Sequence, residues 1–266
     1  MMRAPAVLLA CLAAAALAAP TLAPYPPDRI DLARMRQPPS AAHWFGTDDL
    51  GRDVLARVLY GARVSLAVGL LSAAVAGVSG IAVGGASGYF GGAPDAVLMR
   101  ATDALLAVPR LPLLMILAAI LQPSIPLLIV IIGLASWMET ARVVRAEFRS
   151  LRTSGFVESA RATGAGHARV ILRHLLPNAA QAATISVTLA VARGILLESA
   201  LSFFGVGVRP PQASWGNMLY QSQATLGSEP WFALAPGGFI LLTAMAVNAI
   251  GDRYSITGAA SPDSSS

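Results

Sequence analysis

Six apolar segments, each about 20 residues long, constrain the fold of this chain more than any other feature. They cover residues 4–23, 62–88, 97–121, 125–142, 180–206 and 232–250. A helix rises about 1.5 Å per residue, so each segment can cross the roughly 30 Å hydrocarbon layer of a bilayer. Hydrophobic residues make up 55% of the chain and charged residues only 12%, which leaves too little polar surface for a soluble globule. We therefore predict an all-α integral membrane protein with about six transmembrane helices.

The first apolar segment has two interpretations. Arg3, a short apolar core and the Ala and Pro residues at its end fit a retained helix at 1–23 and also a cleaved secretory signal. We expect the retained helix and keep the signal as the alternative.

The chain has one cysteine, Cys11, so no internal disulfide can form. Cys11 lies in the first apolar segment, where we expect a small buried thiol.

A basic stretch interrupts the apolar pattern before the fifth segment, with the sequence RAEFRSLRTSGFVESARATGAGHARVILRHLLPN at 145–178. Arginines outnumber acidic residues here. The arginines are Arg142, which lies just before the stretch, and Arg145, Arg149, Arg152, Arg161, Arg169 and Arg173, and the acidic residues are Glu147 and Glu158. Such a segment cannot lie in hydrocarbon, and arginine-rich loops mark the cytoplasmic side of a membrane protein. We therefore predict a cytoplasmic loop at 143–178. Alternation then places both termini in the cytoplasm and residues 24–60, 122–124 and 207–231 outside.

The chain contains no lysine, so its net charge of +5 arises from 19 arginines that set topology. They do not cluster on a folded polar face, and we expect the lipid bilayer and no nucleic acid as a partner. The missing lysine also excludes ATP hydrolysis through a GxxxxGK[ST] phosphate loop.

Within the basic loop, the residue types predict a short helix from about Ser154 to Gly164 or Gly166. Ser154 is a suitable N-cap, and a glycine after the last turn can adopt the left-handed cap conformation. A second helix, from about 167 to 176, is expected to stop at Pro177. From the residues alone, a generic amphipathic helix lying on lipid headgroups explains the loop equally well.

The sequence ESARATG at 158–164, followed by nine residues and then HLLP, resembles the EAA loop of ABC importer permeases. Two further blocks resemble the second, C-type permease of the dipeptide, oligopeptide and nickel importers: HWFGTDDLGRDVLARVLYGARVSLAVGL at 43–70 and LLESALSFFGVGVRPPQASWGNML at 196–219. With GYFGG, LMRATDALLAVP, RHLLPN and NAIGD, the likeness covers about residues 43–252. The chain departs from the pattern at Ser159, in place of the middle Ala, and at His174, a position often occupied by Ile.

This resemblance implies a type I ABC importer permease (MetI-like) architecture that moves dipeptides or oligopeptides across the bacterial cytoplasmic membrane by alternating access. In that family the loop helix seats in a cleft on an ATP-hydrolysing subunit. The implied ATPase-coupling residues are Glu158, Ser159, Ala160, Gly164, Leu176 and Pro177. The implied partners are a second permease subunit, two ATP-binding cassette subunits and an extracytoplasmic solute-binding protein. No enzymatic activity and no cofactor are expected of this chain.

Polar side chains elsewhere do not predict a catalytic or metal site. His43, His167 and His174 each lack a His, Cys or Glu neighbour at metal-ligand spacing, and no nucleophile and base pair is visible. In the charged stretch at 48–57, Asp53 and Arg57 are expected to pair at i, i+4 on a solvated helix face.

A docking surface for a solute-binding protein is the alternative for that stretch. Trp215 either contributes to this surface or anchors the chain at the membrane interface.

Two arginines, Arg110 and Arg193, fall inside predicted spans. A charge near the centre of a span costs at least about 2.5 to 3.5 kcal/mol, so each is a functional candidate. We hypothesise that one or both face the translocation path and attract an anionic group such as a peptide carboxylate. The alternative is structural pairing with Asp103, Glu198 or an acid of a partner subunit. Asp103 is also expected to pair locally with Arg100.

The chain divides accordingly into an N-terminal helix at 1–23, an external segment at 24–60, a permease core at 61–252 and a disordered tail at 253–266. Import of nickel or another small solute is the alternative within this class. An ion-coupled secondary transporter is the alternative from another class, and it predicts paired broken helices with ionisable residues at the membrane midplane.

Overall fold

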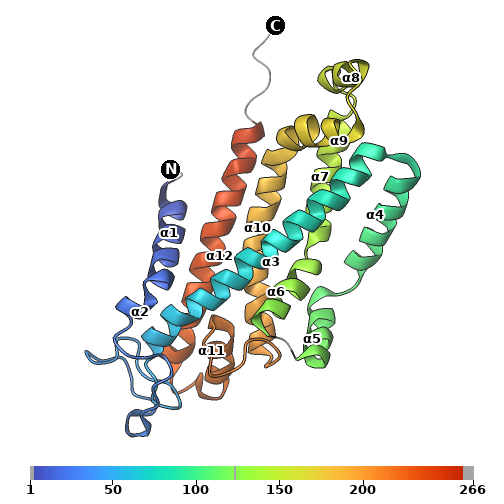
Figure 1. The fold of residues 1–266 in the computed structure, drawn as a ribbon. Coiled ribbons are helices and arrows are strands. Elements are labelled where there is room, and N and C mark those ends of the chain that lie inside the picture. Colours follow the sequence, from blue (N-terminus) through green and yellow to red (C-terminus); the bar gives the residue numbers. More distant parts are fainter. Residues whose placement is uncertain (1–2, 123, 260–266) are drawn as a thin grey trace.

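The computed structural model describes residues 3–122 and 124–259, and in these ranges the regular elements are helices. The elements that build the long axis of the molecule are α1 (Arg3–Leu17), α3 (Val54–Phe90), α4 (Gly92–Ala107), α5 (Arg110–Leu121), α6 (Ile125–Leu134), α7 (Trp137–Leu151), α10 (Leu176–Phe203) and α12 (Pro230–Ala259). The shorter elements are α2 (Ala19–Leu22), η1 (Leu32–Arg34), α8 (Gly155–Ala162), α9 (His167–Val170), η2 (Ile171–Leu175), α11 (Trp215–Ser222) and η3 (Gln223–Thr225). Figure 1 shows the long helices side by side, with α3 crossing the bundle diagonally. The predicted all-α class is confirmed.

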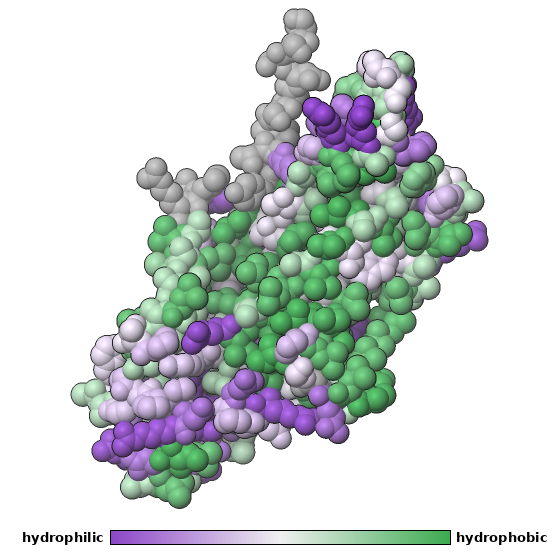
Figure 2. Space-filling view, viewed as in Figure 1, coloured by the Kyte–Doolittle hydropathy of each residue, from purple (hydrophilic) through white to green (hydrophobic). Residues whose placement is uncertain are grey.

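Three helical stretches are long and apolar enough to cross a membrane: Val54–Phe90, His167–Phe203 and Pro230–Arg253. Two bent helix pairs are long and apolar enough only when each pair is taken together: α4 with α5, bent by 82°, and α6 with α7, bent by 42°. The first predicted span is an apolar helix of only 15 residues, α1, followed by the short α2. Figure 2 shows the apolar surface as a band between two polar ends, as expected for a protein surrounded by lipid.

Helix α3 is longer than the predicted span at 62–88, because it already begins at Val54, within the charged stretch. The Asp53 carboxylate accepts a hydrogen bond from the Ala56 N–H at 2.7 Å and caps the helix, which then runs without a break for 37 residues. The helix ends in a glycine turn, since Gly91 and Gly92 have φ angles of +65° and +55°.

The structure departs from the prediction at two prolines. Pro109 was expected inside a continuous span, but α4 ends before it and α5 starts after it at an angle of 82°. Pro177 was expected to stop a helix, but α9, η2 and α10 follow one another directly from His167 to Phe203. The reason is the π-helical turn η2, in which the Leu176 N–H bonds to the Ile171 carbonyl. Pro177 therefore falls in the first turn of α10, where its missing N–H is tolerated.

A row of glycines on α3 lets α7 approach closely. A Cβ atom added to Gly80 would lie 2.8 Å from the Trp137 carbonyl oxygen, and one added to Gly88 would lie 2.7 Å from the Arg145 carbonyl oxygen. Gly84, between them, faces the Ala141 backbone. Small residues spaced four apart allow this packing in a membrane, where the hydrophobic effect does not drive helices together.

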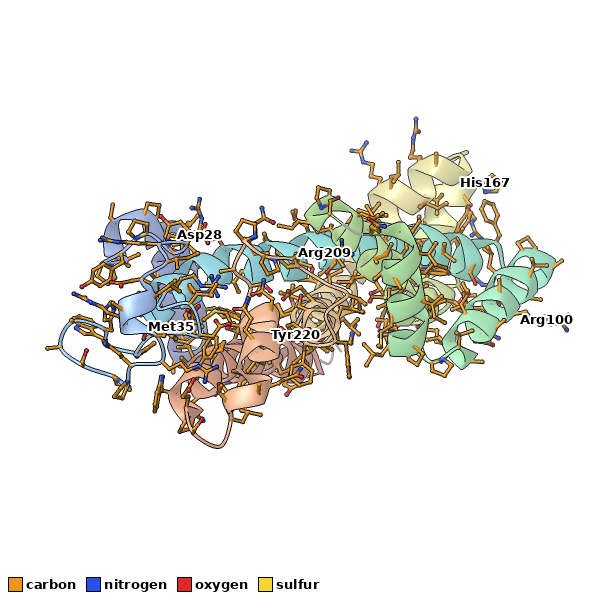
Figure 3. All side chains as sticks on the ribbon, turned by 90° about the horizontal axis from the view of Figure 1, so that it is seen from below. Asp28, Met35, Arg100, His167, Arg209 and Tyr220 are labelled. Carbon is orange, nitrogen blue, oxygen red and sulfur yellow. The ribbon has the colours of Figure 1, made fainter. Side chains whose placement is uncertain are left out.

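The two ends of the bundle differ in structure. Helix α8 forms one end, and α12 ends and α1 begins toward the same side (Figure 1). The segment 24–53 and α11 form the opposite end, which Figure 3 shows from below with Asp28, Met35, Arg209 and Tyr220 labelled. Helix α12 continues to Ala259, so residues 253–259 are helical where a disordered tail was predicted, and 260–266 lie outside the described residues.

Candidate functional site

Helix α8 stands at the end of the bundle with most of its surface exposed (Figure 1). Its predicted cap at the carboxyl end is confirmed. Gly164 has a φ angle of +81°, its N–H bonds to the Arg161 carbonyl at 2.9 Å, and the Ala165 N–H bonds to the Ala160 carbonyl at 3.0 Å. This pair of bonds is the Schellman motif, which ends the helix after two turns.

The cap at the amino end of α8 differs from the prediction. Ser154 occupies the N-cap position, but its hydroxyl donates to the Leu151 carbonyl of the preceding helix, and no side-chain cap bond forms. That hydrogen bond ties the start of α8 to the end of α7.

The six residues expected to couple this chain to an ATPase belong to two segments, α8 with its cap and the start of α10. Both segments pack on the same apolar cluster. Glu158, Ser159 and Gly164 are exposed, and Ala160 is half-buried. Their helix is held by Val157, which is fully buried in a cluster with Phe148, Val170, Leu175 and Ala179, among others. Leu176 packs against the same cluster, whereas Pro177 is exposed. Through this cluster α8 packs against side chains at the end of α7 and at the start of α10.

Tyr89, at the end of α3, was not singled out from the sequence, yet it contacts both sides of this loop. Its hydroxyl lies 2.7 Å from His167 Nδ1 on α9, and the Arg161 guanidinium of α8 lies 5.4 Å from the centre of its ring. Figure 3 shows His167 at this edge of the molecule. His167 thus makes a polar contact with α3. Through Tyr89, the loop is linked directly to the longest helix of the bundle.

A bidentate ion pair fixes α4 against α7 near the same end. Arg145 donates from Nε to Asp95 Oδ1 at 2.6 Å and from Nη2 to Oδ2 at 2.7 Å. The Ser87 hydroxyl of α3 donates to the same carboxylate. Since three helices share this carboxylate, the α8 end of the bundle is held together by charge as well as by packing.

The two arginines within spans pair with an acid that the sequence reasoning missed. Arg110 Nη2 donates to Glu139 Oε1 at 2.8 Å, and Arg193 Nε lies 3.3 Å from Glu139 Oε2. The predicted partners Asp103 and Glu198 are both engaged elsewhere. Glu139 follows an apolar run within a predicted span, and an acid in that setting was the signal that could have found it.

Asp103 accepts from Arg142 Nη2 at 2.6 Å and not from Arg100, which contradicts the predicted local pair. Figure 3 shows Arg100 at the outer edge of α4. Glu198 is fully buried and accepts from the Ser65 hydroxyl at 2.9 Å and the Ser202 hydroxyl at 2.8 Å.

The charged stretch at 48–57 is largely buried rather than solvated, although the Asp49 side chain is 39% exposed. Asp48 and Arg57 are 0% exposed, and Arg52 Nε donates to Asp48 at 2.6 Å. The Asp53 carboxylate bonds to His43 Nδ1 at 2.8 Å, and not to the Arg57 side chain as predicted. The buried residues build the inside of the α11 end and therefore offer no docking surface.

Trp215 is likewise 0% exposed, and its Nε1 donates to the Val58 carbonyl at 3.1 Å, which makes it a core residue and not an interfacial anchor. Cys11, expected to be buried, is exposed on α1. Among the described residues, no group of three or more His, Cys, Asp or Glu side chains is placed to hold a metal ion.

Comparison with known proteins identifies the class. Residues 80–255 match the family described as the binding-protein-dependent transport system inner membrane component. The chain is 44% identical over 248 residues to a protein of Brucella suis biovar 1 named as a peptide permease, covering 92% of this chain and 82% of that relative. It is 35% identical over 237 residues to the oligopeptide transport system permease protein of Bacillus subtilis, covering 89% and 78% respectively.

The inward-facing MetNI methionine ABC transporter has a similar fold, with a TM-score of 0.59 at 17% identity over 78% of this chain and 98% of that chain. The predicted MetI-like architecture is thereby confirmed. Broken helices and charges within spans, which we associated with a secondary transporter, do occur here, so these features do not separate the two classes. The family match does separate them: the chain belongs to the binding-protein-dependent transport system inner membrane components and is a permease subunit of an ABC transporter.

Proposed function

We propose that this chain forms one half of the channel of an importer that moves dipeptides or oligopeptides by alternating access. The observation that carries the proposal is the identity of 35% to 44%, extending over about nine tenths of the chain, to proteins named as peptide or oligopeptide permeases. A second permease subunit would complete the channel, and a solute-binding protein would deliver the peptide from outside.

Energy would come from two ATP-binding cassette subunits that contact α8. The exposed residues Glu158 and Ser159 offer the contact, and the buried Val157 offers the mechanical link to the bundle. Tyr89 extends this link to α3. An ATPase that pulls on α8 would therefore move α3, α7 and α10 together.

This proposal places the α8 end in the cytoplasm, with both termini on that side and residues 24–60 outside. The arginines around α8 support this orientation by the positive-inside rule. Single cysteines introduced at Gly164 and at Gly227, in a Cys11→Ser background, would test it. In intact spheroplasts a membrane-impermeant maleimide should label only the cysteine at 227, and labelling only at 164 would reverse the orientation.

Transport itself is tested in proteoliposomes that contain this permease with the permease, ATPase and binding-protein partners encoded beside it. ATP-dependent uptake of a labelled tripeptide should exceed uptake of Ni²⁺ under the same conditions. Uptake of Ni²⁺ without uptake of any peptide would contradict the proposal.

Coupling through α8 is tested by a matched pair of substitutions two residues apart. An added Cβ meets nothing within 4 Å at either Gly164 or Gly166, but only Gly164 has a positive φ angle, +81°. Gly164→Ala should therefore strain the cap by about 1–2 kcal/mol and reduce peptide transported per ATP hydrolysed, whereas Gly166→Ala should have little effect. Equal transport by both variants would argue against a mechanical role of this cap.

A further inference from the structure

Three charged side chains from three helices meet inside the bundle. Arg110 is the first residue of α5, Glu139 lies in the first turn of α7, and Arg193 lies within α10. The ion-pair distances from Glu139 are 2.8 Å to Arg110 and 3.3 Å to Arg193. One carboxylate thus serves two guanidinium groups that are far apart in sequence.

The cluster lies near half the depth of the membrane-crossing region. Measured along α10 at 1.5 Å per residue, Arg193 is about 15 Å from Phe203, and the ion pairs hold Glu139 and Arg110 close to it. This end of α10 faces the α11 side of the bundle (Figure 1). Half of a hydrocarbon layer of roughly 30 Å corresponds to the same distance.

These side chains are only partly covered by their own chain. The exposed fraction is 22% for the Arg110 side chain, 37% for Glu139 and 32% for Arg193. Charges at this depth cannot face lipid, because hydrocarbon offers no solvation. The surface that carries them must therefore border water or another protein subunit.

The cluster has an excess of positive charge. Two guanidinium groups share one carboxylate, and the positive end of the α5 helix dipole lies at Arg110. Arg193 Nε and Nη2 are enclosed and have no hydrogen-bond acceptor among the described residues. The contact of Arg193 with Glu139 is therefore an ion pair by distance without a formed hydrogen bond. A second carboxylate would satisfy this arginine, since guanidinium binds carboxylates through paired hydrogen bonds.

We propose that Arg110, Glu139 and Arg193 form a carboxylate-binding site in the translocation path, which receives the terminal carboxylate of the transported peptide. A cavity of about 230 Å³ opens beside Arg110 at the break between α4 and α5, lined also by Leu113, Leu134 and Met138. Glu139 holds the arginines in place when the site is empty and gives up Arg193 to the incoming carboxylate. This inference rests on the proposed peptide transport.

The test compares uptake of trialanine and its carboxyl-terminal amide by the reconstituted complex. The binding protein is the same in every sample, so a change in the ratio of the two rates between variants reports on the permease. Arg193→Gln should reduce the preference for the free carboxylate by about tenfold, and Arg193→Lys should retain part of it. Glu139→Gln should shift the preference in the opposite direction, because it frees both arginines.

Arg100→Gln serves as the control, since Arg100 is exposed on the outer edge of α4 (Figure 3). An amide peptide with a glutamate side chain separates the two sources of carboxylate and should be transported no better than the trialanine amide. An unchanged ratio in both Arg193→Gln and Glu139→Gln would overturn the site, and would indicate that these charges pair with a neighbouring subunit. Peptide uptake by the unmodified complex would still stand in that case, whereas its absence would refute the proposed function itself.

Discussion

A methyl group added at Gly84 should separate α3 from α7. The new Cβ would lie 2.3 Å from the Ala141 carbonyl oxygen and 2.9 Å from the Ala141 Cα, where ordinary contacts begin at 3.4 Å. The obstacle is backbone, so the helices must move apart by about 1 Å, which also loosens the contacts at Gly80 and Gly88. Overpacking of this kind costs about 1–3 kcal/mol. Alanine regains up to about 1 kcal/mol through its helix propensity.

Because backbone cannot yield, we take the upper part of that range, about 2–3 kcal/mol, and subtract about 1 kcal/mol for helix propensity. The expected net loss for Gly84→Ala is then about 1–2 kcal/mol, which lowers the ratio of folded to unfolded protein about 5- to 30-fold. Unfolding in mixed micelles of dodecyl maltoside and increasing SDS, followed by tryptophan fluorescence, measures this change. Gly238→Ala in α12 is the matched control, because an added Cβ there meets nothing within 4 Å. If Gly84→Ala were as stable as Gly238→Ala, the close packing of α3 and α7 would be refuted.

Three further predictions concern individual contacts. Trp215→Phe removes the indole N–H from a buried backbone carbonyl of α3 and should destabilise the folded protein by about 1–3 kcal/mol, and unchanged stability in the same SDS titration would contradict the contact. Tyr89→Phe keeps the ring beneath Arg161 but loses the hydrogen bond to α9, so the amount of peptide transported per ATP hydrolysed should fall. It should fall further in Tyr89→Leu, which also loses the ring, and an equal ratio in the unmodified protein and both variants would rule out this link. Asp95→Asn and Arg145→Gln should each cost about 1–2 kcal/mol, with the double variant costing less than the sum, whereas additive losses would show that the two side chains act independently.

Short stretches of sequence predicted those elements that depend mainly on neighbouring residues in the chain. The apolar segments gave the spans, and Ser154 and Gly164 bracketed α8 because helix ends depend on nearby residues. Proline was less informative. Pro109 breaks a span, whereas a π-helical turn just before Pro177 lets the helix continue, and the sequence contained no clear sign of that turn.

Pairing between distant helices could not be predicted, because it depends on how the bundle packs. Arg110 and Arg193 were recognised as unusual from their apolar surroundings, but their shared partner Glu139 is 29 and 54 positions away (139−110 and 193−139). The same limit applies to Arg57, whose burial depends on Asp48 and on Gln221, 164 positions away. The sequence thus shows which charged side chains need a partner, but only the folded structure shows which residue that partner is.

If this chain is driven as proposed, α8 receives motion from an ATPase. A single cysteine at the exposed position 159, made by Ser159→Cys in a Cys11→Ser background, tests this by crosslinking within the assembled complex. We expect a crosslink to an ATP-binding cassette subunit whose yield changes between the nucleotide-free and ATP-bound states. A complex that imports peptide normally while this cysteine never crosslinks to an ATPase in either state would contradict it.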